Sequence, residues 1–183
     1  MNIHPLAHVQ GAVIGEYTNV WQFTVILPGA VIGSNCNICA QVFIEGDVVI
    51  GDNVTIKNGV YVWNGVRMED NVFIGPSVVF TNDLLPRSKR HGLYGTTLIQ
   101  KGASLGANTT VLTGITVGAY AMSGIGSVLT RHVPAHALVY GNPARQHGWV
   151  DEQGRKLQQQ SAGTWVSEDG IVYRETEQGL EKL

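Results

Sequence analysis

Apolar residues recur at every sixth position through the first half of the chain. Twelve successive positions six apart are apolar, and most are β-branched: Ile14, Val20, Ile26, Ile32, Ile38, Ile44, Ile50, Ile56, Val62, Met68, Ile74 and Phe80. This period is neither that of an amphipathic helix nor the simple alternation of a two-faced strand. It fits short strands with inward β-branched residues, separated by turns. The repeat predicts a parallel β-helix, in which stacked coils bury a continuous core.

A second set of small or β-branched residues lies two positions before each of these. Its members are Ala12, Thr18, Thr24, Ala30, Cys36, Val42, Val48, Val54, Val60, Val66, Val72 and Val78. We expect both sets to point inward, with three repeats closing one triangular coil. Gly15, Gly33 and Gly51 recur at the spacing of such a coil, where the chain needs to bend. Neighbouring coils would then lie roughly 4.8 Å apart.

The six-residue register breaks after Phe80 and resumes at Ile99, continuing to Leu129. The intervening segment is polar, basic and rich in Gly and Pro. We therefore predict that residues 81–96 project from the coil as a loop. Long loops in compact domains are uncommon unless they are functional, so this loop is the first candidate for a site.

The repeat is absent after Arg145, which divides the chain into a β-helix domain (1–145) and a smaller segment (146–183). Residues 158–163 are interpreted as a soft linker. Residues 164–166 and 171–173 flank a Ser-Glu-Asp-Gly turn and predict a β-hairpin. Because the open end of a coil stack needs covering, we expect this segment to be a cap.

The composition excludes several classes of protein. The 183 residues are 14% charged and 44% hydrophobic with 23 glycines, which argues against a disordered chain and against a helix bundle. The two cysteines do not make a disulfide framework, and neither a signal peptide nor a membrane-spanning run is visible. We expect a cytoplasmic protein that binds neither membrane nor nucleic acid.

The charges are unevenly placed although the formal net charge is only −2. No acidic residue lies between Asp83 and Asp151. That span carries six cations: Arg87, Lys89, Arg90, Lys101, Arg131 and Arg145. This half of the chain suits a multiply anionic small ligand. The alternative is a chance cluster on a solvated surface.

Residues 12–145 resemble the hexapeptide-repeat acyltransferases. The resemblance is carried by the repeat together with Ser-Gly-Ile-Gly-Ser-Val (123–128), Val-Pro (133–134) and Gly-Asn-Pro-Ala-Arg (141–145). It implies an all-β fold, a left-handed parallel β-helix with one extruded loop and a small C-terminal cap. It also implies a homotrimer with sites between subunits, and coenzyme A bound with its adenine end near the Gly-Asn-Pro-Ala turn.

A narrower resemblance covers residues 69–76, 80–83, 86–88 and 101–108. These segments are similar to N-acetyltransferases that modify the 3-amino group of nucleotide-linked sugars for bacterial surface glycans such as O-antigen. One branch uses dTDP-3-amino-3,6-dideoxyhexoses, and the other uses UDP-2-acetamido-3-amino-2,3-dideoxyglucuronate. Phe-Thr-Asn-Asp (80–83), with Tyr-Val-Trp-Asn-Gly (61–65) before it, favours the dTDP branch. Acetyl-CoA is the implied donor.

The resemblance points to Asn82 as the first catalytic candidate, because the Asn of the family's Phe-Thr-Asn contacts the reacting amine. The alternative is an Asx turn that starts the loop. Asp83 could order the loop or hold the sugar amine. A general base is not obvious: His91 lies in the loop and Glu69 precedes it, and neither stands out.

The remaining candidates concern binding. Tyr61 and Trp63 should point outward because Val62 points inward, and they could stack on a base or pack against another subunit. The loop cations Arg87, Lys89 and Arg90 could contact phosphates or face solvent. Expected coenzyme A contacts are Ala103, Ala121 and Gly124 for the pantetheine arm, with Arg131, Gly141, Asn142, Pro143 and Arg145 near the adenine end.

We expect no metal site. Cys36 and Cys39 occupy a Cys-x-x-Cys, but Cys36 takes an inward position and packing explains it better. His132 and His136 are interpreted as solvated turn histidines, since Pro134 prevents the helix that would bring them together. A carbonic-anhydrase-like β-helix is disfavoured because residues 12–80 contain no histidine. A non-catalytic β-helix scaffold stays open as the alternative.

Overall fold

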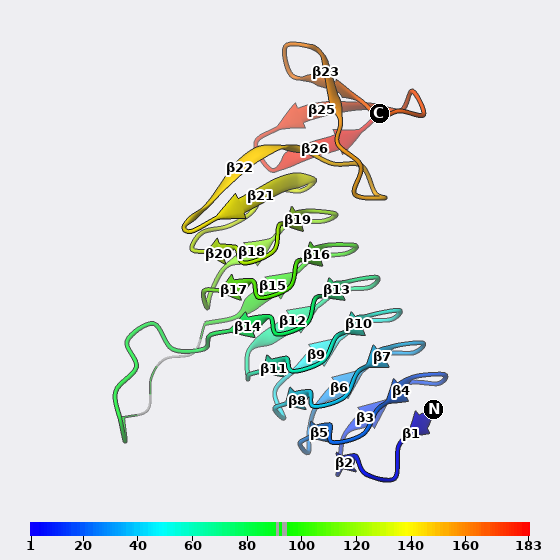
Figure 1. Ribbon diagram of the computed structural model, residues 1–183, viewed down its shortest axis with the longest axis vertical. Helices are drawn as coiled ribbons and strands as arrows, with labels where there is room; N and C mark the ends of the chain where they lie inside the picture. The colour runs from blue at the N-terminus through cyan, green and yellow to red at the C-terminus, as the bar shows by residue number, and fades with distance from the viewer. Residues whose placement is uncertain (91, 93–94) are drawn as a thin grey trace.

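The computed structural model describes residues 1–90, 92 and 95–183, and Figure 1 shows them as a tall stack of short strands. Three parallel sheets form the three faces of the stack. The first contains β1 (Asn2–Ile3), β4 (Asn19–Val20), β7 (Asn37–Ile38), β10 (Thr55–Ile56), β13 (Phe73–Ile74), β16 (Ser104–Leu105) and β19 (Met122–Ser123). It continues into β21 (Ala137–Gly141) and ends with the antiparallel strand β22 (Ala144–Trp149).

The other two faces are built in the same way. The second sheet contains β2 (His8–Val9), β5 (Val25–Ile26), β8 (Phe43–Ile44), β11 (Tyr61–Val62), β14 (Val79–Phe80), β17 (Thr110–Val111) and β20 (Val128–Leu129). The third contains β3 (Val13–Ile14), β6 (Val31–Ile32), β9 (Val49–Ile50), β12 (Val66–Met68), β15 (Thr97–Ile99) and β18 (Thr116–Val117). The all-β repeat fold predicted from the sequence is confirmed; its left-handed winding stays an expectation from the resemblance.

The register confirms the triangular coil of three repeats. Asn19 pairs with Asn37, Asn37 with Thr55, and Thr55 with Phe73, so each coil advances by three six-residue repeats. Both predicted inward sets are buried along the stack, and Ile26, Ile38, Ile44 and Ile56 are fully buried. Ala12 and Ile14 are only half-buried because their coil has a neighbour on one side. The six-residue pattern therefore corresponds directly to the core.

The glycines at the corners of the coil allow close packing between coils, whereas the sequence suggested that they bend the chain. Gly33 does not itself adopt a left-handed backbone; Asn35, two residues later, does, at φ 56°. Asparagine tolerates this region better than most residues. A Cβ at Gly33 would instead lie 2.5 Å from the carbonyl oxygen of Gly51 in the next coil. Glycine is needed here for the close approach of successive coils.

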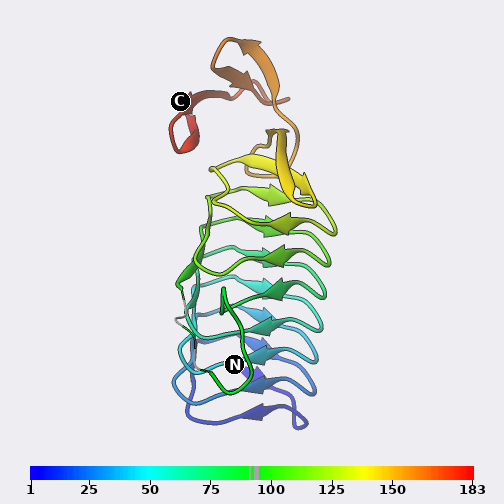
Figure 2. The same cartoon turned by 90° about the vertical axis from the view of Figure 1, so that its left-hand side faces the viewer.

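One loop leaves the stack between β14 and β15, where the sequence predicts it. Figure 1 shows it projecting from the side of the stack, and Figure 2 shows it passing in front of the middle coils. In the described chain no helix is long and apolar enough to span a membrane.

The C-terminal segment covers the end of the stack, as predicted (Figure 1). Its four-stranded antiparallel sheet contains β23 (Gln158–Ser161), β24 (Thr164–Val166), β25 (Val172–Thr176) and β26 (Gly179–Lys182). The predicted hairpin is β24–β25. The linker prediction for residues 158–163 is wrong, because β23 pairs with β24 as an exposed edge strand. β22 also runs past the predicted domain boundary at Arg145, to Trp149.

Candidate active site

The candidate site lies along one edge of the stack, where strands of the second sheet pass to the third. We call it the loop edge, because the extruded loop leaves the stack there (Figure 1). Val79 pairs with Thr110 and Thr110 with Val128, so the residues that follow these strands stack in register. This register places Asn82 and Arg131 two coils apart on the same edge, at about 10 Å given the usual strand spacing.

Threonine hydroxyls close the base of the loop. The Thr81 hydroxyl donates to the carbonyl of Val111 (3.2 Å) and accepts the N–H of Thr113 (3.0 Å). The Thr113 hydroxyl donates to the carbonyl of Gly95 (3.3 Å), so a single buried threonine holds both ends of the loop. Sequence reasoning missed Thr113. The sequence could have indicated it, because the repeat places this polar residue in register with the start of the loop.

Asp83, not Asn82, makes the turn that starts the loop. Its carboxylate accepts the N–H of Leu85 (2.9 Å), which is the geometry of an Asx turn. The side chain of Asn82 is half-buried and makes no hydrogen bond to any described residue. Asp83 therefore orders the start of the loop.

An aromatic cluster lies directly below the base of the loop. The Trp63 indole N–H donates to the carbonyl of Phe80 (2.9 Å), which brings the ring beneath the residues that begin the loop. The Phe43, Tyr61 and Trp63 ring centroids lie 5.6–6.3 Å apart. Tyr61 is 54% exposed and Val62 is buried, so the predicted outward orientation is confirmed for Tyr61, whereas Trp63 is half-buried and packs against the core. A cavity of about 590 Å³ lies on the outer face of the second sheet; its lining runs from Phe23 and Gln41, at the edge toward the first sheet, across Phe43 and Tyr61 to Trp63 at the loop edge.

Of the two candidate general bases, Glu69 lies away from the base of the loop. Glu69 follows β12 at the opposite edge of the third sheet, where its carboxylate accepts the N–H of Lys101 (2.8 Å). Asp70 plays the same coil-linking role toward the N–H of Asp52 (2.8 Å). The structure gives Glu69 a role in coil stacking, away from Asn82. His91 lies outside the described residues.

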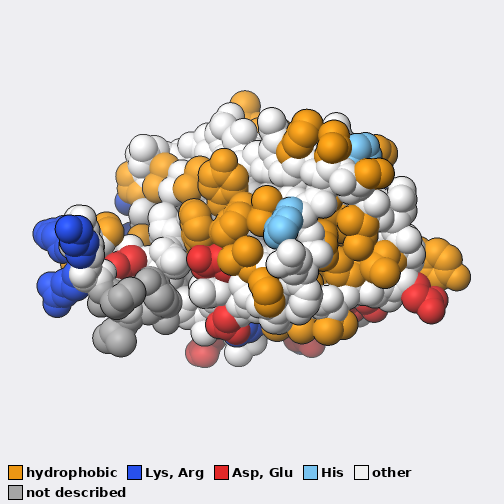
Figure 3. All heavy atoms as spheres, turned by 90° about the horizontal axis from the view of Figure 1, so that it is seen from below, with side chains coloured by type: hydrophobic (Ala, Val, Ile, Leu, Met, Phe, Trp, Pro, Cys, Tyr) orange, Lys and Arg blue, Asp and Glu red, His pale blue; other side chains and the backbone are white. Residues whose placement is uncertain are grey.

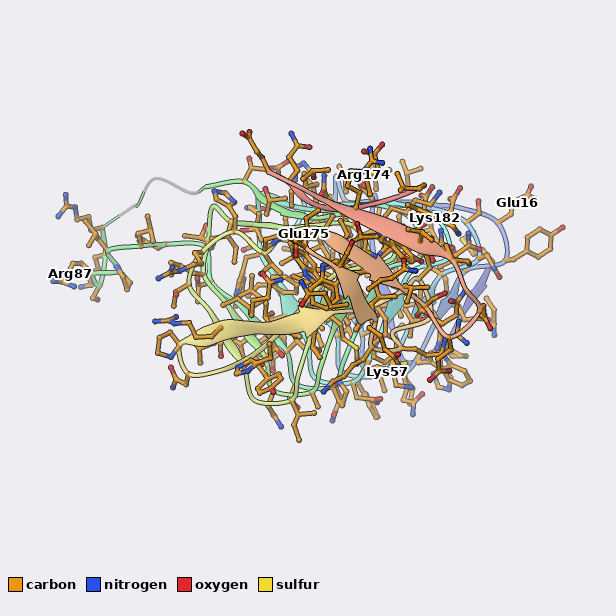
Figure 4. The ribbon with its side chains drawn as sticks, turned by 90° about the horizontal axis from the view of Figure 1, so that it is seen from above. Glu16, Lys57, Arg87, Arg174, Glu175 and Lys182 are labelled. Atoms are coloured by element: carbon orange, nitrogen blue, oxygen red, sulfur yellow. The ribbon has the colours of Figure 1, made fainter. Side chains whose placement is uncertain are left out.

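The loop cations Arg87, Lys89 and Arg90 are exposed at the far end of the loop. Figure 3 shows Lys and Arg side chains gathered there, and Figure 4 shows Arg87 pointing away from the stack. Within the described part of the chain none of the three forms a salt bridge. The structure does not bring them to Asn82 of the same chain.

A second cavity, of about 260 Å³, lies between the last coil and the β21–β22 hairpin. It is lined by Arg131 and Arg145 together with His132, Pro134, Val139 and Gln146, among others. The described residues that line it include no acid. Gly141, Asn142 and Pro143 form the exposed turn of the hairpin beside it. Two guanidinium groups in one pocket suit an anionic, phosphate-bearing ligand. We call this cavity the arginine pocket.

Three of the predicted cofactor contacts have packing roles in the structure. Ala103 and Ala121 are fully buried in the core, so their side chains do not line an outer groove. They hold inward positions of the repeat, and the sequence pattern already placed them there. At Gly124, a Cβ would lie 2.9 Å from Cβ of Tyr140. This glycine lets the hairpin pack closely on the coil, which is a structural role.

The interpretation of the two histidines holds for only one of them. His132 is exposed, and its Nδ1 accepts the N–H of Thr116 (2.9 Å). His136 is 5% exposed, so its interpretation as a solvated residue is wrong. It is buried because the cap packs over it. Cys36 is buried as expected, and burial raises the pKa of its thiol. Among the described residues no group of three potential ligands could hold a metal.

A family comparison agrees with this geometry. The description "Bacterial transferase hexapeptide (six repeats)" matches residues 11–46 and 47–82, which are the coils below the loop. Residues 11–82 are therefore similar to the hexapeptide-repeat transferases. The matched coils supply the aromatic cluster and the base of the loop, whereas the arginine pocket lies in later coils.

Similar proteins act on amino sugars or bind coenzyme A. The chain is 55% identical over 64 residues to dTDP-3-amino-3,6-dideoxy-α-D-galactopyranose 3-N-acetyltransferase of Aneurinibacillus thermoaerophilus, covering 35% of this chain and 33% of that protein. A mutant of perosamine N-acetyltransferase from Caulobacter crescentus, in complex with CoA and GDP-perosamine, superposes with a TM-score of 0.55 at 26% identity. That match covers 80% of this chain and 55% of that one.

An acetyltransferase from Vibrio cholerae complexed with acetyl coenzyme A superposes with a TM-score of 0.57 at 25% identity, covering 77% and 72% of the two chains. The chain therefore spans about a third of the Aneurinibacillus relative and about half of the Caulobacter enzyme.

Proposed function

We propose that this protein moves the acetyl group of acetyl-CoA to the amino group of a nucleotide-linked sugar. The observation that carries the proposal is the loop edge itself. An acid-free pocket lined by two arginines lies above Asn82 in the stack, and the strand register puts Arg131 about 10 Å from Asn82. Below Asn82, an aromatic cavity on the second sheet reaches the loop edge at Trp63. A phosphate-rich donor and a nucleotide sugar can therefore meet at one edge, at the base of the loop.

The chemistry requires position and polarity. A neutral sugar amine attacks the thioester carbonyl, the C–S bond breaks, the amine loses a proton and the thiolate gains one. Arg131 and Arg145 hold the donor phosphates, which aligns the thioester with the amine. The amide of Asn82 interacts with the amine or donates to the developing oxyanion, where a preorganised donor has its greatest effect.

The acceptor we favour is a dTDP-3-amino-3,6-dideoxyhexose for bacterial surface glycan synthesis such as O-antigen. The name of the Aneurinibacillus relative, Phe-Thr-Asn-Asp (80–83) and the stacking surface of Tyr61 and Trp63 support it. UDP-2-acetamido-3-amino-2,3-dideoxyglucuronate is the alternative. We propose that the protein acts in the cytoplasm as a homotrimer. In this trimer Arg87, Lys89 and Arg90 of one subunit would reach the nucleotide bound at the next.

A non-catalytic scaffold is the competing function, and ligand binding separates the two. Isothermal calorimetry should detect acetyl-CoA binding to the wild type. The double variant Arg131→Ala/Arg145→Ala should weaken it at least about tenfold, because charge-assisted hydrogen bonds contribute roughly 1.5–3 kcal/mol each. Lys57→Ala, on a turn between the first and second sheets, is the matched control and should bind like the wild type. Absence of binding to the wild type would favour the scaffold.

A further inference from the structure

A buried histidine stands at the base of the β21–β22 hairpin, directly before β21. We propose that His136 is a positioning residue that holds the hairpin and its Arg145 in place, and that this anchor weakens when the buried imidazole becomes charged. Acetyl-CoA affinity should then fall as the pH drops. This inference rests on the proposed function, because it concerns the pocket assigned to acetyl-CoA.

His136 joins the two strands where the hairpin begins and ends. Its carbonyl accepts the N–H of Val150 (2.8 Å), and its Nδ1 lies 2.9 Å from the carbonyl of Val150 and donates to it. Its own backbone N–H donates to the carbonyl of Ala119 in the coil below (2.8 Å). One residue therefore ties the end of β22 both to the start of β21 and to the stack.

The imidazole ring is enclosed by two aromatic rings from different parts of the fold. Tyr120 of the stack lies against it with centroids 5.1 Å apart, nearly parallel. Tyr173 of β25 in the cap meets it edge-on at 5.3 Å. The ring of His136 thus packs between the stack and the cap at the end of the hairpin.

The arginine pocket depends on this anchor because β22 is an edge strand. In the described sheet β22 pairs only with β21, whereas β21 also pairs with β19 of the last coil. Ala144, Arg145 and Gln146 of β22 line the pocket. The hydrogen bonds to His136 help to fix the end of β22 to the stack, together with the packing of Trp149 against the core and the hydrogen bond from the N–H of Leu157 to the carbonyl of Trp149 (3.0 Å).

Burial lowers the pKa of His136, although nearby groups oppose this. The charged groups that face it are Asp151, Glu152 and Lys182, and the phenols of Tyr120 and Tyr173 contact its ring. Both carboxylates are already engaged. Asp151 pairs with Arg155 (2.8 Å), and Glu152 accepts hydrogen bonds from Tyr173 (2.6 Å) and Lys182 (3.1 Å).

The sign of the effect follows from the lowered pKa. When the hairpin end is released, the ring is solvated and regains its ordinary pKa near 6.5. The released state therefore binds protons more readily than the anchored one. The anchor is complete above about pH 6.5 and weakens as the pH falls toward the lowered pKa.

The test compares acetyl-CoA binding by calorimetry at about pH 7.5 and about pH 5.5, on either side of the ordinary histidine pKa. His136→Asn is the key variant: its amide can donate to the Val150 carbonyl, asparagine tolerates the φ of 63° found here, and it does not titrate. Between these two pH values the wild type should lose more acetyl-CoA affinity than this variant, because only the wild type carries a group at this position that takes up a proton. The phosphates of acetyl-CoA titrate in the same way with both proteins, so their contribution to the pH dependence of affinity cancels in the comparison.

His132→Asn is the control, because His132 is a second histidine close to the hairpin and lines the pocket itself. It should retain the wild-type pH dependence. If His136→Asn shows the same pH dependence as the wild type, or if His132→Asn abolishes it, the proposal is wrong.

A second measurement needs neither a variant nor acetyl-CoA. NMR titration of the wild type should give His136 a pKa below the ordinary value, and the amide signals of β22 should shift with the same midpoint. If the β22 amides respond but acetyl-CoA never binds, the anchor stands and the proposed function fails. An ordinary His136 titration, or β22 amides that ignore it, would overturn the anchor.

Discussion

At the residue scale, Asn82 carries the chemistry in our account. It is half-buried at the base of the loop, and its side chain has no hydrogen-bond partner among the described residues. We expect Asn82→Ala to lower kcat/KM on the order of a hundredfold, the usual effect of losing one transition-state donor. The assay is thiol release from acetyl-CoA in the presence of the amino sugar.

The control for this prediction is Asn58→Ala, an exposed asparagine on a turn between the first and second sheets. It should retain wild-type kcat/KM. Full activity of the Asn82 variant would remove this residue from the site and direct attention to the backbone groups at the base of the loop.

Residue roles were predictable where the repeat determines them. Val62 is buried and Tyr61 exposed because side chains alternate along a strand. His136 could not be predicted, because Tyr173, which lies 37 positions later in the sequence, encloses it only after the cap has folded. The burial of Ala103 and Ala121 follows from the repeat, which gives both residues inward positions, so only their backbone groups could face a ligand.

At the element scale, each coil is stabilised by the residues that it buries against its neighbours. Ile50 and Val49 occupy the same strand, β9, with Ile50 1% exposed and Val49 42% exposed. We expect Ile50→Ala to lower the free energy of unfolding by about 2–5 kcal/mol, because the stacked coils cannot collapse around the cavity. Chemical denaturation measures this.

Val49→Ala is the matched control, since it removes apolar atoms from the outer face of the same strand. Its effect should stay within about 0.5 kcal/mol. Equal losses for the two variants would contradict the assignment of inward and outward positions, or would show that the outer face of β9 is covered in an assembly.

Elements with a strong period were predicted well and elements without one poorly. The coil strands and the loop follow from the repeat and its interruption. The polar strand β23 (Gln158–Ser161) carries no apolar alternation, and it forms because β24 offers it a free edge. Tertiary pairing therefore decides its structure, whereas its local sequence suggested a linker.

At the scale of the whole molecule, the near-neutral net charge conceals a strong asymmetry. The span between Asp83 and Asp151 carries positive charge alone, and the acidic residues on both sides of it in the sequence balance that charge. The fold gathers two of these cations, Arg131 and Arg145, in one pocket and leaves Arg87, Lys89 and Arg90 on the loop. The sequence predicted an anionic ligand for this half, and the three-dimensional register adds where it would lie relative to Asn82.

The most direct test of the central claim is an acetyl-transfer assay with the purified full chain. Free thiol release from acetyl-CoA is followed with a panel of dTDP- and UDP-linked 3-amino sugars, and the product is checked by mass for the added acetyl group. We predict release that requires both substrates and is fastest with a dTDP-3-amino-3,6-dideoxyhexose. Release only with the UDP-glucuronate would change the acceptor, and no acetylated product with any amino sugar would contradict the account.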